Sequence, residues 1–168
     1  MKLRIRIKLP VRLVEETRAH LVKPHPFAAE RVGFISARPA SIADGVLLAA
    51  HSYIPVADDD YVDRPGYGAY IGGAAIRKAM QFSFNNNASV FHVHVHDHRG
   101  VPRFSDIDLA EYPKFVPDFW KVQPALPHGA LLLSRDRAIA LVWYPGQRRP
   151  IPAAEVWSVG THMVRLNA

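Results

Sequence analysis

The stretch FHVHVHDHRGVPRFSDID, residues 91–108, carries four histidines at consecutive even positions: His92, His94, His96 and His98. The run that contains the first three, Ser89 to His96, is rich in β-branched and aromatic residues, which is typical of a β-strand. Residues two apart in a strand point to the same side, about 6.5–7 Å apart along the chain. We therefore expect the histidines to share one face, with Val93 and Val95 packed into the opposite, apolar face.

Histidines in this arrangement are typical metal ligands. Two imidazoles from one strand can converge on a single ion, with zinc–nitrogen bonds of about 2.0–2.1 Å. A lone histidine on an apolar strand is usually a core residue, but each buried neutral ring needs both a donor and an acceptor, and four rings in register are hard to satisfy in that way. We favour metal ligation, with an exposed polar strand face and a pH-sensing cluster as alternatives.

The residues that follow the histidines offer an oxygen ligand. Asp108 ends the sequence Ser105-Asp106-Ile107-Asp108, at the start of a short helix predicted from Asp106 to Tyr112. Ser-x-x-Asp is also the pattern of a helix N-terminal capping box, and one carboxylate can serve both roles because a helix start holds it well. A catalytic zinc ion needs three protein ligands and one open position, so two histidines and this aspartate are a sufficient set.

Upstream of the histidines, the sequence predicts strands and helices in alternation. Basic residues alternate with apolar ones at the start of the chain and predict a half-buried strand with a solvated basic face: Lys2, Arg4, Arg6 and Lys8. Apolar residues at helical spacing predict an amphipathic helix over Val11 to Leu21. Two strands, Arg31 to Ala37 and Val46 to Val56, and a second helix, Gly73 to Asn85, follow.

Downstream, the pattern predicts a hairpin and a final strand. The hairpin strands are Gly129 to Leu133 and Ala138 to Tyr144, and the last strand lies near Val156 to Val164. The proline-punctuated segment Pro113 to Pro127 is predicted to be coil. The order of these elements predicts one α/β domain over residues 1–168, with a mixed sheet flanked by helices rather than an all-β sandwich.

The segment Ala57 to Gly73 has the composition of a surface loop. It contains three consecutive aspartates, Asp58 to Asp60, followed by Pro65-Gly66 and several further glycines. Long loops in compact domains are often functional. We consider three roles for it: holding a substrate segment as an added strand, closing as a lid, or serving as a plain surface loop.

Composition excludes several classes of protein. The 168 residues include no cysteine, which excludes disulfide scaffolds, cysteine-ligated zinc sites and thiol nucleophiles. The formal net charge of +6 is compatible with a nucleic-acid or acidic protein partner, but the basic residues are scattered and do not interleave with aromatic ones. We find no signal peptide and no apolar run that could span a membrane, so we expect a cytoplasmic protein.

Taken in order, these motifs resemble the JAB/MPN metalloproteases that carry the JAMM motif. That family combines an upstream Glu-x-x-Gly with His-x-His and Ser-x-x-Asp. Here Glu30-Arg31-Val32-Gly33 enters a strand after a helix, and the helix at Gly73 to Asn85 precedes the histidine strand. The resemblance covers roughly residues 11–145. It implies a JAB/MPN-like, that is cytidine-deaminase-like, mixed sheet flanked by helices.

The resemblance also implies a role for each site residue. A zinc ion, Zn²⁺, would be held by His94, His96 and Asp108. Glu30 would take a proton from the zinc-bound water and deliver it to the leaving amine, and Ser105 would stabilise the oxyanion. Read alone, Glu30 is an ordinary surface glutamate.

Two choices of histidine pair stay open, because each differs from the family spacing by one residue. The number of residues that the family usually has between the second histidine and the serine lies between the numbers that two pairs give here. His94 with His96 leaves eight residues before Ser105, and His96 with His98 leaves six. We prefer His94 with His96 because they lie on a regular strand and the following loop can absorb an extra residue. His92 is then either a neighbour that orients a ligand ring or a buried residue.

The activity implied by the resemblance is that of a zinc-dependent isopeptidase or peptidase. It would cleave after the C-terminal tail of a ubiquitin-like protein, in precursor processing or deconjugation, as a stand-alone bacterial-type enzyme. Its partners would be that substrate and the enzymes that activate and conjugate it. A non-catalytic MPN-type scaffold is the alternative, which the joint presence of Glu30, Ser105 and Asp108 disfavours, and a basic nucleic-acid-binding domain rests on net charge alone.

Overall fold

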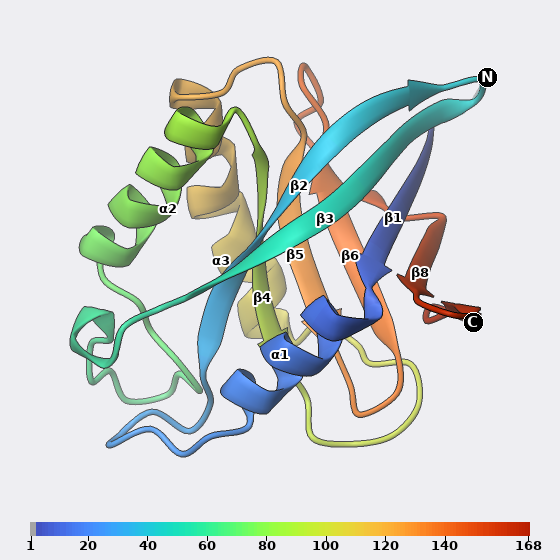
Figure 1. Ribbon diagram of the computed structural model, residues 1–168. Helices are drawn as coiled ribbons and strands as arrows, with labels where there is room; N and C mark the ends of the chain where they lie inside the picture. Colours follow the sequence, from blue (N-terminus) through green and yellow to red (C-terminus); the bar gives the residue numbers. More distant parts are fainter. Residues whose placement is uncertain (1–2) are drawn as a thin grey trace.

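A single sheet of nine strands organises the protein, in the order β7-β6-β5-β4-β2-β3-β1-β8-β9 (Figure 1). The computed structural model describes residues 3–168. The strands are β1 (Arg4–Pro10), β2 (Val32–Ile42), β3 (Gly45–Pro55), β4 (Ser89–Val95), β5 (His128–Leu133), β6 (Ala138–Trp143), β7 (Ile151–Pro152), β8 (Glu155–Val159) and β9 (Met163–Arg165). The helices are α1 (Val11–Leu21), α2 (Gly73–Asn86) and α3 (Asp106–Phe115), with 3₁₀ turns η1 (Asp58–Asp60) and η2 (Val116–Lys121).

The sheet is mixed, and β4 lies near its middle. β4 is antiparallel to β2 and parallel to β5, while β1 is parallel to both of its neighbours, β3 and β8. Figure 1 shows the sheet strongly curled, with α1 on one face and α2 and α3 on the other. The prediction of a mixed sheet flanked by helices is therefore confirmed, and α1 and α2 lie where their apolar periodicity places them.

Each face of the sheet has its own apolar core. The core under α1 contains Leu13 and Val14 of the helix together with Phe91 and Val93 of β4. On the other face, α2 and η2 pack over a second cluster, and Tyr112 of α3 packs in a third. Successive residues of β4 therefore alternate between the two faces. As predicted, Val93 and Val95 pack into the apolar core of the α1 face, which leaves the even-numbered histidines to the face covered by α2 and α3.

β1 is the predicted half-buried strand with a basic face. Its apolar residues are buried, while Arg6 lies 2.9 Å from Asp44 and Arg4 lies 2.9 Å from Glu155. The acidic partners come from the β2–β3 turn and from β8, so much of the basic charge of this face is paired within the protein. Lys2, which we also placed on this strand, lies outside the described residues.

The prediction of coil over Pro113 to Pro127 is wrong for residues 113–121 and confirmed for residues 122–127, which form neither helix nor strand. α3 continues through Pro113 to Phe115, and η2 follows directly as a 3₁₀ turn. A proline removes one N–H donor and crowds the preceding turn. Here the cost is offset because Tyr112, Val116 and Phe119 are all buried against the sheet.

Strand ends also differ from the prediction. β2 extends from Ala37 to Ile42 as one arm of a hairpin with β3, beyond the point where its pairing with β4 stops. This arm has an open edge that tolerates Pro39, and its exposed residues carry no apolar alternation. The single strand predicted near Val156 to Val164 is two antiparallel strands, β8 and β9, separated by a turn at Gly160. None of the helices formed by residues 3–168 is both long and apolar enough to cross a membrane.

Candidate metal centre

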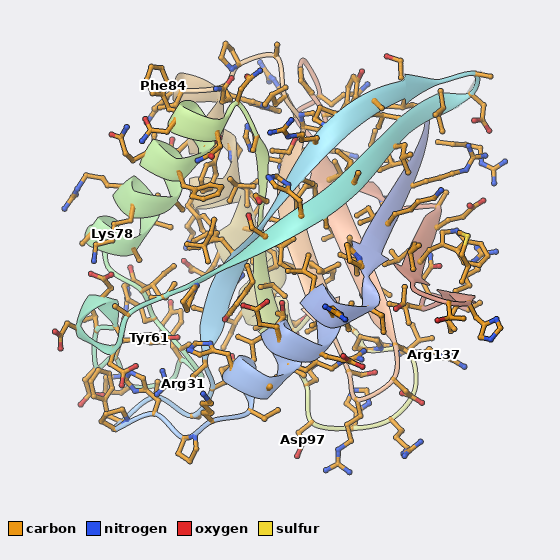
Figure 2. All side chains as sticks on the ribbon, viewed as in Figure 1. Arg31, Tyr61, Lys78, Phe84, Asp97 and Arg137 are labelled. Atoms are coloured by element: carbon orange, nitrogen blue, oxygen red, sulfur yellow. The ribbon has the colours of Figure 1, made fainter. Side chains whose placement is uncertain are left out.

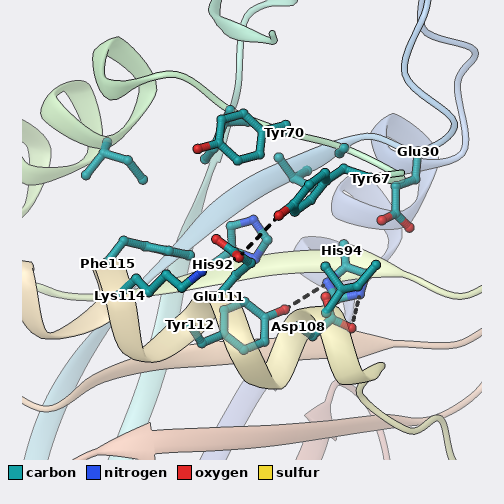
Figure 3. Close-up of a pocket in the computed structure, with 15 residues that line it drawn as sticks. Glu30, Tyr67, Tyr70, His92, His94, Asp108, Glu111, Tyr112, Lys114 and Phe115 are labelled. Atoms are coloured by element: carbon teal, nitrogen blue, oxygen red, sulfur yellow. Dashed lines mark hydrogen bonds and ion pairs between the residues drawn. The ribbon is translucent and has the colours of Figure 1, made fainter. Parts of the chain in front are cut away.

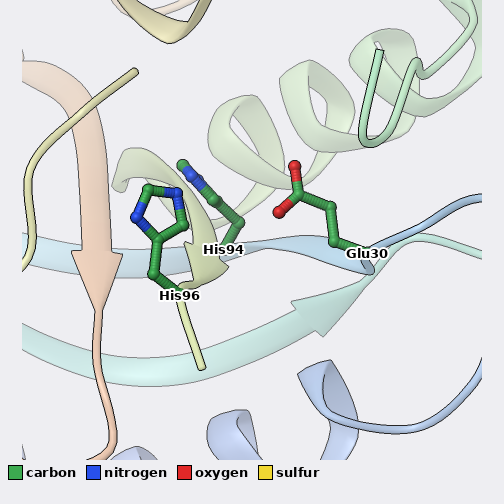
Figure 4. Close-up of side chains that lie close together, drawn as sticks. All are labelled: Glu30, His94 and His96. Carbon is green, nitrogen blue, oxygen red and sulfur yellow. The ribbon is translucent and has the colours of Figure 1, made fainter. Parts of the chain in front are cut away.

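Glu30, His94 and His96 converge at the end of β4, beside the start of β2 (Figure 4). One ligand atom from each of the three side chains lies within 4.8 Å of the others. The topology explains the convergence: β2 and β4 are antiparallel, and Val32 at the start of β2 is in register with His94 near the end of β4. Glu30, two residues before β2, is therefore carried to the two histidines although more than sixty residues separate them in sequence.

Asp108 adds a fourth group from α3. Its Oδ2 lies 3.4 Å from Nε2 of His94. Two ligand atoms that each lie about 2.0–2.1 Å from a tetrahedral zinc ion are about 3.3–3.4 Å apart. The observed separation would fit two ligands of one ion, but the group in which every ligand atom lies within 4.8 Å of the others is Glu30, His94 and His96, and Asp108 contacts this group through His94. Glu30, His94, His96 and Asp108 are hereafter the metal-centre cluster.

The two nitrogens of His94 have different surroundings. Nδ1 lies 3.2 Å from the Tyr112 hydroxyl, whereas Nε2 is buried and has no hydrogen-bond partner in the part of the chain that the structure describes. When Nδ1 carries the proton, the ring donates to Tyr112 and the Nε2 lone pair is left to the metal-centre cluster. Such outer hydrogen bonds fix the tautomer and orientation of metal-binding histidines.

Asp108 is held by the capping box that its sequence predicts. Ser105 N–H and the Ser105 hydroxyl each donate to Asp108 Oδ2 at 2.8 Å, and Asp108 N–H donates to Ser105 Oγ at 3.1 Å. Burial alone would raise the pKa of Asp108, but its contacts with His94 and Ser105 outweigh burial and hold that pKa well below its usual value. The carboxylate therefore stays ionised while it caps α3 and faces His94.

Glu30 is a largely buried carboxylate. Burial raises its pKa, an effect that His94 opposes and Asp108 reinforces. Its position depends on the loop between η1 and α2, because the N–H groups of Ala29 and Glu30 both donate to the Gly68 carbonyl, at 2.8 and 3.2 Å. A Cβ at Gly68 would lie 2.6 Å from Glu30 Oε1, so any other residue there would push this carboxylate from its observed position.

A second set of contacts fixes the segment that carries Glu30. The buried guanidinium of Arg31 donates to the carbonyls of Lys23 and Pro24 and pairs with Asp58 of η1. The Tyr61 hydroxyl accepts the Val32 N–H at 2.8 Å. Figure 2 shows Arg31 and Tyr61 close together beside the start of β2. The aspartate run of the predicted loop thus serves partly as an anchor for this segment.

The other two histidines neighbour this cluster without belonging to it: the His92 ring centre lies 6.0 Å from that of His94, and the His98 ring centre 6.2 Å from that of His96. His92 is buried on β4, and its Nδ1 has no hydrogen-bond partner among residues 3–168. Burial lowers the pKa of His92 to about 3, so the ring is neutral. His98 is exposed in the loop after β4, and its Nδ1 is hydrogen-bonded to the Arg99 carbonyl. Of the predicted registers, the structure brings together His94 with His96.

A cavity of about 270 Å³ opens beside the metal-centre cluster (Figure 3). Its walls come from the loop before α2, from β2, from helices α2 and α3, and from β4, which contributes His92 and His94. Part of the predicted loop Ala57 to Gly73 is therefore a wall of a cavity. Its strand-like part is a bridge between Tyr61 and Ile71, with a further hydrogen bond from Val62 N–H to the Tyr70 carbonyl.

Sequence reasoning missed several residues of this site. Tyr112 and Gly68 act through contacts between segments far apart in the chain, and neither stands in a recognisable motif. Arg31 was noted only as part of a strand. Ser105 was assigned to the oxyanion, whereas its hydroxyl is engaged with Asp108 in this structure.

The donor set fits a zinc ion on chemical grounds. Imidazole nitrogens and carboxylate oxygens are common zinc ligands, and the buried, unpartnered Nε2 of His94 is oriented towards the other groups. The structure groups the two predicted histidine ligands with Glu30, which the sequence predicts as the base, whereas the predicted ligand Asp108 lies against His94. No protein-family model matches the sequence, and no curated protein matches it significantly.

Proposed function

We propose that this protein is a zinc-dependent amide hydrolase of the JAB/MPN type. The observation that carries the proposal is the grouping of Glu30 with His94 and His96, beside which Asp108 contacts His94; these residues come from three separate segments. The element order supports a JAB/MPN-like fold: α1 precedes Glu30, α2 precedes the histidine strand, and α3 begins at the Ser-x-x-Asp sequence. The substrate class, the C-terminal tail of a ubiquitin-like protein, is taken from the resemblance alone.

Each residue of the site has a definite task in this proposal. His94, His96 and Asp108 hold the ion, while Tyr112 orients His94 and Ser105 orients Asp108. When bound, zinc supplies Lewis-acid chemistry, lowering the pKa of water to about 7 and polarising the carbonyl. Glu30 accepts a proton from the attacking water and passes it to the leaving amine, which contributes about 10²–10⁴-fold to the rate. Ser105 can stabilise the oxyanion only after its hydroxyl turns away from Asp108.

The decisive variant is Glu30→Gln, which keeps the shape of the side chain and removes the base. We expect the variant to bind about one zinc ion per chain and to cleave about 10²–10⁴-fold more slowly than the wild type. Zinc is measured by emission spectroscopy after dialysis. Cleavage is measured by mass spectrometry on fusions in which a ubiquitin-like domain precedes a reporter, or is joined to a lysine side chain.

Glu15→Gln is the matched control, because Glu15 is exposed on α1, outside the site. It should leave both zinc content and cleavage unchanged. Loss of zinc from Glu30→Gln would make Glu30 a ligand rather than a base. A zinc-loaded wild type that cleaves no amide bond in a panel of fusions and peptides would overturn the hydrolase proposal and favour a binding module.

A further inference from the structure

The cavity beside the metal-centre cluster has no part in the roles assigned above. Glu30, His94 and Asp108 lie along one side of it, so a group bound there would lie next to the bond to be cleaved (Figure 3). Its volume of about 270 Å³ is near the lower limit of small-molecule sites, which are about 300–1,000 Å³. It is a space for one side chain rather than for a cofactor.

Most of the remaining wall is apolar. Val32, Ile71, Ile76, Ile107 and Phe115 contribute hydrocarbon surface from four different segments of the chain. An apolar group that enters this space leaves water and gains contact with those side chains. A glycine would leave the space unfilled.

The charges at the cavity are already engaged. Lys114 Nζ lies 2.6 Å from Glu111 Oε1, and the Tyr67 hydroxyl lies 3.5 Å from the same oxygen. The other charged groups in the lining, Glu30 and Asp108, belong to the metal-centre cluster. A charged substrate side chain would therefore lose its water without gaining a free partner of opposite charge.

In the loop before α2, the exposed Arg64 packs over two aromatic rings. The Arg64 guanidinium lies 4.8 Å from the ring centre of Tyr67 and 4.4 Å from that of Tyr70. The two rings themselves meet edge to face at 5.2 Å. Both rings line the cavity, and aromatic groups pack well against such surfaces.

We propose that this cavity binds a bulky, uncharged apolar side chain, preferably aromatic, of a residue that flanks the scissile amide. The proposal rests on the hydrolase function for its cleavage consequence. It assigns substrates whose cleavage site carries such a residue, in contrast to a tail that ends in small residues only.

Binding can be measured without catalysis. The protein, labelled at isoleucine δ1 methyl groups, is titrated with N-acetylphenylalaninamide at millimolar concentration and followed by NMR. We expect the methyl signals of Ile71, Ile76 and Ile107 to shift, and those of Ile5 and Ile7 in the opposite core to stay in place. N-acetylglycinamide and N-acetyllysinamide should shift none of them.

Cleavage preference is measured on peptides that differ only at the two positions flanking the cut, which mass spectrometry identifies. With zinc bound, we expect kcat/KM for Phe or Leu at one of these positions to exceed that for Gly or Lys at least about tenfold. Ile107→Trp, which fills the mouth of the cavity, should reduce the Phe-to-Gly ratio towards one. Leu109→Trp is the matched control, because Leu109 is similarly exposed on α3 but does not line the cavity (49% against 45%).

The outcomes separate this inference from the proposed function. Methyl shifts without cleavage of any peptide would leave the cavity assignment standing and remove the hydrolase. Cleavage with no preference for apolar residues, together with unshifted methyl signals, would overturn the cavity assignment alone. Equal effects of Ile107→Trp and Leu109→Trp on the Phe-to-Gly ratio would also overturn it.

Discussion

At the scale of single residues, His94 explains both the strength and the limit of the sequence argument. The even spacing of the histidines correctly places His92 and His94 on one face of β4, but the prediction that all four share this face is wrong, because the strand ends at Val95. Counting residues to Ser105 did not choose between the pairs, because the length of the intervening loop can absorb one residue. The structure shows why the pairs differ: β4 ends at Val95, and the His96 N–H still bonds to the Leu133 carbonyl at 2.9 Å, whereas His98 lies in the exposed loop.

Replacing His94 should remove zinc, because its Nε2 is the most enclosed of the proposed donors. We expect His94→Gln, which roughly keeps the side-chain volume, to hold far less than one zinc ion per chain after dialysis against a weak chelator. His98→Gln is the matched control and should keep the zinc content of the wild type. Zinc retained by His94→Gln and lost from His98→Gln would favour the other register.

The residues that support the site could not be found in the same way. Tyr112 contacts His94 across a gap of 18 residues, and Gly68 supports Glu30 from 38 residues away. Neither pair has a fixed spacing that a local pattern could reveal. Such contacts form only when folding brings β2, β4 and α3 together.

At the scale of elements, the start of α3 contributes both to the stability of the fold and to the position of a site residue. Ser105 caps the helix and positions Asp108, so Ser105→Ala should lower the free energy of unfolding by about 1 kcal/mol, within a range of about 0.5–2. The same variant should also slow cleavage, because Asp108 Oδ2 loses the Ser105 hydroxyl donor and the Asp108 N–H loses its acceptor. The backbone N–H of residue 105 remains as a donor to Oδ2.

Ser105→Thr retains the hydroxyl and serves as the control. It should keep most of the unfolding free energy and of the activity. Urea denaturation followed by circular dichroism, with zinc removed by a chelator, separates the cap from metal binding. A Ser105→Ala protein as stable as the wild type would show that the cap contributes no stability.

The periodicity of apolar residues predicts helices and strands well where one face of the element is buried and the other is exposed to solvent. α1 matches its predicted bounds, and α2 ends one residue beyond them. The pattern is uninformative where burial comes from distant partners. α3 continues through Pro113 because Tyr112 and Val116 are buried, and the outer arm of β2 is held by pairing with β3 rather than by any apolar alternation.

At the scale of the whole molecule, acid stability should depend on a histidine remote from the metal-centre cluster. His128 begins β5 and is fully buried; its Nδ1 accepts the Val90 N–H at 3.1 Å, and its ring stacks on Phe119. Burial lowers the pKa of His128 to about 4 from an ordinary 6.5, against a smaller opposing effect of its hydrogen bond to the Gln123 carbonyl.

The direction of the pH effect follows from this lowered pKa. Above about pH 6.5, His128 is neutral in both the folded and the unfolded chain, so it does not affect the pH dependence of the unfolding free energy. Between about pH 6.5 and pH 4, the unfolded chain binds a proton that the folded chain does not. The free energy of unfolding therefore decreases as the pH is lowered through this range, and it levels off below about pH 4. We expect this histidine alone to cost about 2 kcal/mol between pH 7 and pH 5.

His128→Asn removes the titrating ring and should make the loss of unfolding free energy from pH 7 to pH 5 smaller by about that amount, whatever its stability at pH 7. His162→Asn is the control, because His162 is exposed near the end of the chain. The measurement is urea unfolding at each pH. An identical pH dependence in the wild type and His128→Asn would remove this residue from the acid response.

The loop before α2 both supports Glu30 and lines the cavity. The Gly68 carbonyl holds the backbone of Glu30, and its neighbours Tyr67 and Ala69 line the cavity. A change in this loop that reshapes the cavity for another side chain would also displace the carboxylate. During evolution, selectivity and catalytic speed would therefore shift together, and a variant selected for a new target should need compensating changes around Glu30 to recover its turnover.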